Sequence, residues 1–220
     1  MKKTDLKTEA MIWIIMLLPF LFYYLLKDQL PQEVSVHYNV HGEADRTMQP
    51  LNFVLTMFAL NVFVYLVIMA APYMDPKKNN YARFPKFYSL LRWVMPAFMS
   101  GIVVFEYLKP LGFTGTSGKA IYVPVLLLLM FLGNYLGSVK QNWFIGIRTP
   151  WTMSNEDVWR KTHRLGGRMM FFASLTGLLC LFFLPVEWMA ALVLTIALGS
   201  ALVSVVYSWI CYRTLQKQSK

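Results

Sequence analysis

Residues 142–167 read NWFIGIRTPWTMSNEDVWRKTHRLGG and form the longest polar interruption in an otherwise apolar chain. They contain three of the seven tryptophans and the turn-prone sequence Arg148-Thr149-Pro150. On both sides the chain is a succession of apolar runs, and a helix needs about 20 such residues to cross a bilayer. We therefore expect this stretch to form a structured segment at a membrane surface, with the rest of the chain as its scaffold.

The composition of the chain excludes an ordinary soluble domain. Of the 220 residues, 57% are hydrophobic and 15% are charged, whereas roughly 25% are charged in soluble domains. The net charge of +10 would suggest a nucleic-acid partner in a soluble protein, but here the basic residues flank apolar runs, so we expect no direct nucleic-acid contact. Cys180 and Cys211 lack metal-ligand spacing, which indicates two inert, buried thiols.

Six apolar runs predict an all-α, polytopic membrane protein with six transmembrane helices. The runs cover residues 10–26, 51–73, 88–108, 120–139, 168–184 and 188–212. Lys2, Lys3 and Lys7 before the first run resemble the start of a signal peptide. No small-residue cleavage site follows that run, so we expect it to be retained as the first membrane helix.

The distribution of basic residues predicts the orientation of these helices. The two termini and the loops at 74–87 and 140–168 together hold 16 of the 21 Lys and Arg residues, and the alternate loops hold four. The positive-inside rule therefore places both termini and the motif loop, residues 140–167, in the cytoplasm. A basic inner face of this kind attracts anionic lipids.

Two small clusters lie inside the predicted spans. Gly133 and Gly137 have the small-xxx-small spacing that lets two helices approach closely, which favours a packing role, with Asn134 as a polar link between helices. Glu106 lies three residues before Lys109 near the outer end of its span, so the two side chains are expected to pair on one helix face.

The first outer loop, residues 27–50, predicts a folded cap. Apolar and polar residues alternate over 34–40, which is typical of a short strand, and 41–45 reads as a turn. The polar residues of this cap are His37, Asn39, His41, Glu43 and Asp45. A metal site is not expected, because four residues of strand would separate the two histidines by about 13 Å. We predict instead a hydrogen-bonded surface that could contact a ligand.

The motif loop combines a restrained turn with a short surface helix. Gly146 and Pro150 restrict the backbone around Arg148, and Ser154 is placed to cap a helix that runs to about Arg164 and ends at the Gly166-Gly167 pair. Trp159 and His163 would share one face of this interfacial helix, between the fourth and fifth spans, and Arg160 and Arg164 the adjacent face. These residues alone fit a membrane-surface elbow stapled by Trp and Arg, or a binding site.

The motif residues carry a resemblance to a known family. Gly133-Asn134-Tyr135, Asn142, the run IGIRTPWT at 145–152, Val158-Trp159 and THRLGG at 162–167 resemble the signature of the SdpI family. That family is named after the immunity protein for a bacterial sporulation-delay peptide toxin. The outer-loop residues Leu30-Pro31, His37, Asn39, Gly42 and Asp45 resemble a small membrane domain of unknown function that is often found ahead of it.

The resemblance implies a multi-pass protein of the bacterial plasma membrane with two parts. Residues 1–73 would form an N-terminal two-helix unit, and 74–220 an SdpI-like four-helix unit. The family implies protection against an extracellular peptide toxin at the outer face and recruitment of a cytoplasmic transcriptional regulator. The residues that match the cytoplasmic motif are the candidate partner-binding residues: Asn142, Arg148, Thr149, Pro150, Trp151, Trp159, Thr162, His163 and Arg164.

Two alternatives remain open at the level of sequence. One is a membrane enzyme or transporter that uses the polar outer loop or the motif loop. Against it, the chain shows no nucleophile–base motif, no P-loop, no HExxH and no evident internal repeat, so we predict no catalytic residues and no cofactor. The other alternative is an assembly scaffold without a ligand, in which outer-loop substitutions would be harmless.

Overall fold

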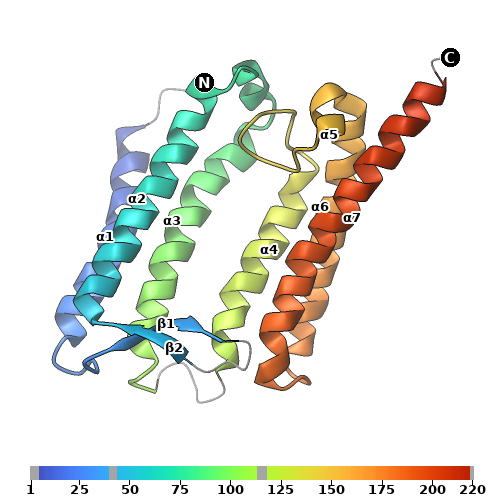
Figure 1. The fold of residues 1–220 in the computed structure, drawn as a ribbon. Helices are drawn as coiled ribbons and strands as arrows, with labels where there is room; N and C mark the ends of the chain where they lie inside the picture. Colours follow the sequence, from blue (N-terminus) through green and yellow to red (C-terminus); the bar gives the residue numbers. More distant parts are fainter. Residues whose placement is uncertain (1–4, 40–43, 113–117, 219–220) are drawn as a thin grey trace. The chain divides into compact units, whose positions relative to one another are not determined.

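The computed structural model describes residues 5–39, 44–112 and 118–218. Helices dominate it, with one two-stranded hairpin (Figure 1). The elements in chain order are α1 (Leu6–Leu26), β1 (Val34–Tyr38), β2 (Ala44–Met48), α2 (Pro50–Met74), η1 (Lys78–Arg83), α3 (Pro85–Leu108), η2 (Lys119–Ile121), α4 (Tyr122–Leu136), α5 (Pro150–Ser154), α6 (Glu156–Cys180), η3 (Val186–Trp188) and α7 (Met189–Gln218).

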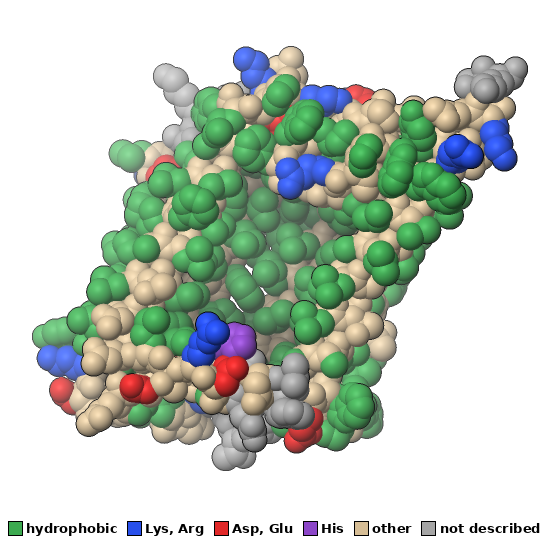
Figure 2. Space-filling model, in the orientation of Figure 1, with side chains coloured by type: hydrophobic (Ala, Val, Ile, Leu, Met, Phe, Trp, Pro, Cys, Tyr) green, Lys and Arg blue, Asp and Glu red, His purple; other side chains and the backbone are tan. Residues whose placement is uncertain are grey.

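Hydrophobic side chains cover the length of the helices, and charged side chains gather near their ends (Figure 2). Within the described residues, five helical segments are long and apolar enough to cross a membrane: Leu6–Leu26, Pro50–Met74, Pro85–Leu108, Lys119–Leu136 and Val186–Gln218. The protein is therefore a multi-pass membrane protein. The predicted fifth span, residues 168–184, lies largely in α6, whose first half is too polar to qualify; a sixth crossing stays a prediction, as does the orientation.

The chain divides into two compact units that interleave along the sequence. The first unit comprises Met1–Met69, Leu90–Pro124 and Pro185–Ala190, and the second comprises Ala70–Ser89, Val125–Leu184 and Ala191–Lys220. These units are defined by contacts in space, whereas the domains predicted from sequence, 1–73 and 74–220, are continuous stretches of chain. The two divisions answer different questions, so the predicted domains stay a prediction.

The first unit packs α1, α2 and α3 against one another and against the hairpin. Its core beside the hairpin joins Val34 of β1 to Phe53, Val54, Val103 and Tyr107 of α2 and α3. The Tyr107 hydroxyl donates to the carbonyl of Pro50 at 2.6 Å, which ties the start of α2 to the end of α3. The strand predicted from the alternating pattern is confirmed as β1. The predicted turn is wrong at its end, because Ala44 and Asp45 belong to β2.

Residues Gly166 and Gly167 do not end a helix in the second unit, contrary to the sequence prediction. α6 is one continuous helix that fuses the predicted interfacial helix with the predicted fifth span, and its cap is Asn155, not Ser154. The two glycines face different neighbours. A Cβ on Gly167 would lie 2.6 Å from the carbonyl oxygen of Gly133 in α4, and a Cβ on Gly166 would overlap the Ser204 hydroxyl of α7. Close packing on two sides therefore requires glycine here.

The role of Gly167 can be tested against a glycine in open space. We expect Gly167→Ala to lower stability by about 1–3 kcal/mol, because α4 and α6 must separate to admit the methyl group. Gly101→Ala in α3 is the matched control, since no heavy atom lies within 4 Å of its added Cβ. Thermal unfolding of both variants in detergent would contradict the prediction if they melted alike.

Candidate functional site

Asn142 organises the connection between α4 and α5, residues 137–149. Its side chain is fully buried. The Oδ1 atom accepts from the backbone N–H groups of Phe144 at 2.9 Å and Ile145 at 2.6 Å, and the Nδ2 atom donates to the carbonyls of Lys140 at 2.8 Å and Ile145 at 2.9 Å. One amide thus satisfies four backbone groups of an irregular segment, as buried polar groups require.

Asp75 anchors the same segment from the end of α2. The residue is 2% exposed. Its carboxylate accepts from the backbone N–H of Trp143 at 2.8 Å, the hydroxyl of Tyr81 at 3.0 Å and the backbone N–H of Lys77 at 2.7 Å. Burial, together with the bond to Asp75, raises the pKa of Tyr81, so its phenol stays protonated and remains a donor. The anchoring role of Asp75 was not predicted, because in the sequence Asp75 resembles an ordinary charged loop residue next to Pro76.

Gln141 links η1 to α5. Its Nε2 atom donates to the carbonyls of Thr152 at 2.6 Å and Met153 at 2.7 Å, and its Oε1 atom accepts from the Lys77 ammonium. The amide of Asn80 donates to the Gln141 carbonyl at 2.7 Å. The segment after α2 is therefore fixed to the motif loop by charge-assisted and neutral hydrogen bonds together.

His163 and Trp159 form the buried side of the motif loop. Their rings stack with centroids 3.9 Å apart. Burial lowers the pKa of His163 to about 4, so the ring is neutral at physiological pH. Its Nε2 atom accepts from the Ile147 N–H at 2.9 Å, which leaves Nδ1 to donate to the Trp159 carbonyl at 2.8 Å. Gly146 faces this ring with a φ of 121°, and a Cβ there would overlap His163.

Helix α5 begins with a reciprocal cap that was not predicted. Thr149 is the N-cap and exchanges bonds with Thr152 in a capping box, with Pro150 in the first turn. The Thr149 hydroxyl also lies 3.0 Å from the Ser208 hydroxyl, which ties the motif loop to α7. Arg148 donates to the Trp143 carbonyl from an exposed position.

Burial separates the predicted partner-binding residues into two groups. The buried ones are Asn142, Thr149, Trp159, Thr162 and His163, and the more accessible ones are Arg148, Pro150, Trp151 and Arg164. The first group holds the shape of the loop from inside. The second group is accessible at the surface, as is Trp143, which is 51% exposed.

The outer loop carries a surface ion pair. The His37 Nδ1 and Asp45 Oδ1 atoms lie 2.6 Å apart, and the hydrogen bond from His37 lowers the pKa of Asp45. Asn39 is half-buried, whereas His41 and Glu43 lie outside the described residues. Within the described part of the chain, no group of three or more His, Cys, Asp or Glu side chains could hold a metal ion.

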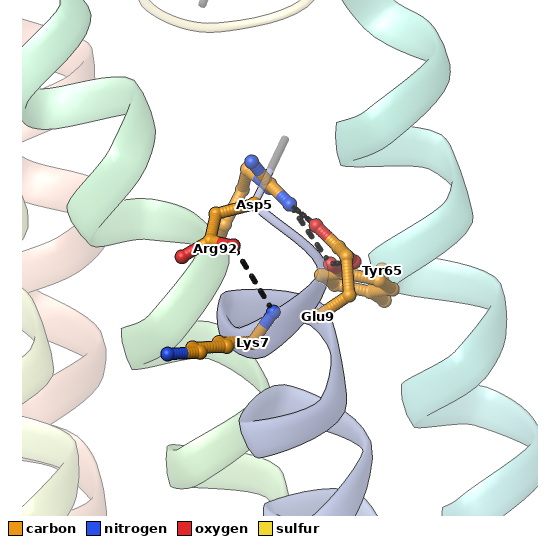
Figure 3. Close-up of polar contacts among 5 residues, drawn as sticks. All are labelled: Asp5, Lys7, Glu9, Tyr65 and Arg92. Atoms are coloured by element: carbon orange, nitrogen blue, oxygen red, sulfur yellow. Dashed lines mark hydrogen bonds and ion pairs between the residues drawn. The ribbon is translucent and has the colours of Figure 1, made fainter. Parts of the chain in front are cut away.

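A second polar cluster joins the three helices of the first unit at the end opposite the hairpin. Glu9 of α1 accepts from the Tyr65 hydroxyl of α2 at 2.5 Å and pairs with Arg92 of α3, and Arg92 also donates to Tyr65 at 3.1 Å (Figure 3). The Glu9 and Arg92 side chains are 21% and 12% exposed. Arg92 lies within the predicted third span, residues 88–108, but the sequence gives no sign of its partner.

The motif loop lies within a segment that is similar to a known protein family. Residues 138–208 match the model of the SdpI/YfhL protein family. Residues 14–62 match a domain of unknown function (DUF1648), so both predicted resemblances are confirmed. The chain is 23% identical over 210 residues to "Immunity protein SdpI" of Bacillus subtilis (strain 168), covering 96% of this chain and 98% of that protein. No solved structure matches it.

Asp75 offers a direct test of the anchoring network. Asp75→Asn removes the charge that strengthens three hydrogen bonds, so we expect a loss of about 1.5–3 kcal/mol in stability and greater proteolytic cleavage in 137–149. Asp157→Asn is the matched control, because that carboxylate is exposed and pairs only with Arg160 among the described residues. Equal melting and cleavage of the two variants would disprove the anchoring role.

Because His163 is neutral in the folded protein, we expect stability to depend on pH. Since its folded pKa lies below the ordinary value of 6.5, the unfolded chain takes up a proton that the folded chain excludes as the pH falls below 6.5. The contribution of His163 to the free energy of unfolding should be constant above pH 6.5. Between pH 6.5 and 4 the free energy of unfolding should fall by about 3 kcal/mol. Melting curves in detergent at several pH values would measure this, and His163→Gln should flatten the slope over pH 7 to 5. An unchanged slope in that variant would assign it to another group.

Proposed function

We propose that this protein is a non-enzymatic membrane immunity protein that protects its cell against an extracellular peptide toxin. The observation that carries the proposal is the match to an immunity protein over nearly the full length of both chains. The match spans the N-terminal domain and the SdpI segment in one alignment, so it includes both the outer hairpin (β1 and β2) and the motif loop.

The surface we propose for the toxin is the outer hairpin and the cleft beside it. This cleft has a volume of about 170 Å³ and is lined by Pro31, Glu33, Val34, Ser35, Glu106, Lys109 and Pro110. Glu33 accepts from Thr47 across the hairpin, and Glu106 pairs with Lys109 at 3.8 Å. The ion pair of His37 and Asp45 adds a polar rim on the hairpin itself.

The motif loop is the proposed surface for a soluble transcriptional regulator. Arg148, Trp151 and Arg164 offer cationic and aromatic groups, the residue types enriched at protein interfaces. The basic surroundings would also hold this face against anionic lipids. A signal from outside requires two states that the toxin populates differently. The proposed two-state element is the loop between α4 and α5, which side-chain hydrogen bonds hold in place.

Survival of sensitive bacteria that express the protein tests this proposal. The challenge is a sporulation-delay-type toxin and related secreted peptides, and membrane levels of all variants are matched. We expect the wild type to protect and His37→Gln with Asp45→Asn to raise sensitivity by about tenfold, since each lost charged hydrogen bond costs about 1.5–3 kcal/mol. Lys217→Gln is the control, because it also changes a charge but lies in α7, far from the hairpin in the sequence.

The inner surface is tested in the same strains by membrane recruitment of the regulator. Arg148→Ala with Trp151→Ala should abolish recruitment, while Arg160→Ala, whose side chain is exposed and pairs with Asp157, should leave it intact. Absence of protection against every peptide would overturn the immunity proposal. Protection without any recruited protein would restrict the function to immunity alone.

A further inference from the structure

A groove in the second unit shares only Arg164 with the motif-loop surface proposed for the regulator. It has a volume of about 520 Å³ and runs between α4 and α6. Its lining residues are Gly133, Asn134, Gly137, Ser138, Arg164, Gly167, Arg168, Phe171 and Phe172. Gly133 and Gly167 form its floor, where the two helix backbones touch. The groove therefore lies beside a close contact between α4 and α6 that only glycine permits.

Two arginines on the α6 wall of the groove are available to bind an anion. Arg164 and Arg168 lie one turn apart and are both exposed. Among the described residues, neither guanidinium has a hydrogen-bond or ion-pair partner, whereas Arg92, Arg148 and Arg160 each have one. Two adjacent guanidinium groups match the geometry of a phosphate and can bind it through several N–H donors.

The lining of the groove changes from cationic to apolar along α6. Phe171 and Phe172 follow Arg168 by one turn, and Phe172 is 61% exposed. On the facing wall, Asn134 is exposed on a helix that is long and apolar enough to span a membrane, and its amide has no partner among the described residues. An amide exposed on such a helix is costly where it faces lipid, unless it finds a hydrogen-bond partner. This order of groups fits a molecule with an anionic head, a polar neck and a hydrocarbon tail.

We infer that this groove binds one anionic phospholipid. Arg164 and Arg168 hold the phosphate, the Asn134 amide donates to the glycerol ester region, and an acyl chain lies along Phe171 and Phe172. The lining contains no Asp or Glu to receive an ammonium group, so the site selects phosphatidylglycerol over a zwitterionic lipid. The inference rests on the membrane setting of the proposed function and is independent of toxin protection.

Native mass spectrometry of the full-length protein in detergent tests this site with defined lipids. The probes are phosphatidylglycerol and phosphatidylcholine of identical chains, and inorganic phosphate as competitor. We expect wild type to retain one phosphatidylglycerol, to retain phosphatidylcholine at least about tenfold more weakly and to keep its lipid in 10 mM phosphate, since each charge-assisted contact contributes about tenfold or more. Equal retention of both lipids, or displacement by phosphate alone, would overturn the assignment.

Matched charge variants localise the binding. Arg164→Gln with Arg168→Gln should reduce phosphatidylglycerol retention by at least about tenfold, and Arg160→Gln with Arg213→Gln, which removes the same charge elsewhere, should not. Asn134→Leu should weaken retention while both arginines remain. If both double variants lost phosphatidylglycerol retention equally, surface charge alone would explain the binding and the site would be refuted.

The survival assay keeps this inference separate from the proposed function. If phosphatidylglycerol is lost from the Arg164 and Arg168 variant and protection persists, the lipid site stands and plays no part in immunity. If wild type retains the lipid yet protects against no peptide, the immunity proposal fails and the lipid site stands. If wild type protects but retains neither lipid selectively, the lipid site fails alone.

Discussion

An irregular backbone beside apolar helices must find a partner for each of its N–H and C=O groups, and the second unit is arranged around this constraint. The thirteen residues between α4 and α5 form no regular structure, so the usual helical ladder cannot satisfy them. Buried side chains supply missing partners: Asn142 from within the segment, Asp75 from the end of α2 and His163 from α6. The motif therefore needs polar residues to satisfy its own backbone, whether or not it also binds a partner.

This necessity divides the work among the motif residues. A fully satisfied buried amide or imidazole fixes one conformation, because any alternative leaves a polar group unpaired at a cost of about 1–3 kcal/mol. The accessible residues Arg148, Trp151 and Arg164 are carried on that fixed framework. A strongly marked sequence motif can therefore contain two kinds of residue, those that shape a surface and those that form it.

Hydropathy and periodicity predicted the positions of the membrane helices because burial in lipid requires long apolar runs. Alternation located β1 for the same kind of reason. β2 was missed because its sequence, Ala44–Met48, is mostly polar and exposed, and pairing with β1 rather than its own pattern makes it a strand. Helix α6 was divided in two because a Gly-Gly pair favours a helix end when only local propensity is considered, whereas contacts with α4 and α7 require it inside the helix.

The partnered charges show a different limit. Asp75 and Trp143 are 68 residues apart in the chain, and Glu9 and Arg92 are 83 apart. No local pattern reveals such pairs, and a charge count assigns Asp75 and Glu9 to the solvated face. Their roles follow only from the folded contacts of each unit.

The side chains of α6 are fixed in phase with three neighbours at once. His163 accepts from Ile147 in the α4–α5 connection, Gly166 accommodates α7 and Gly167 touches α4. Each residue along a helix turns by about 100°, so inserting or deleting a single residue between these positions would point at least one of them in the wrong direction. For the same reason α6 cannot rotate about its own axis without losing all three contacts together. Any change of state in this unit must proceed by sliding, tilting or melting of the loop, and not by a turning helix.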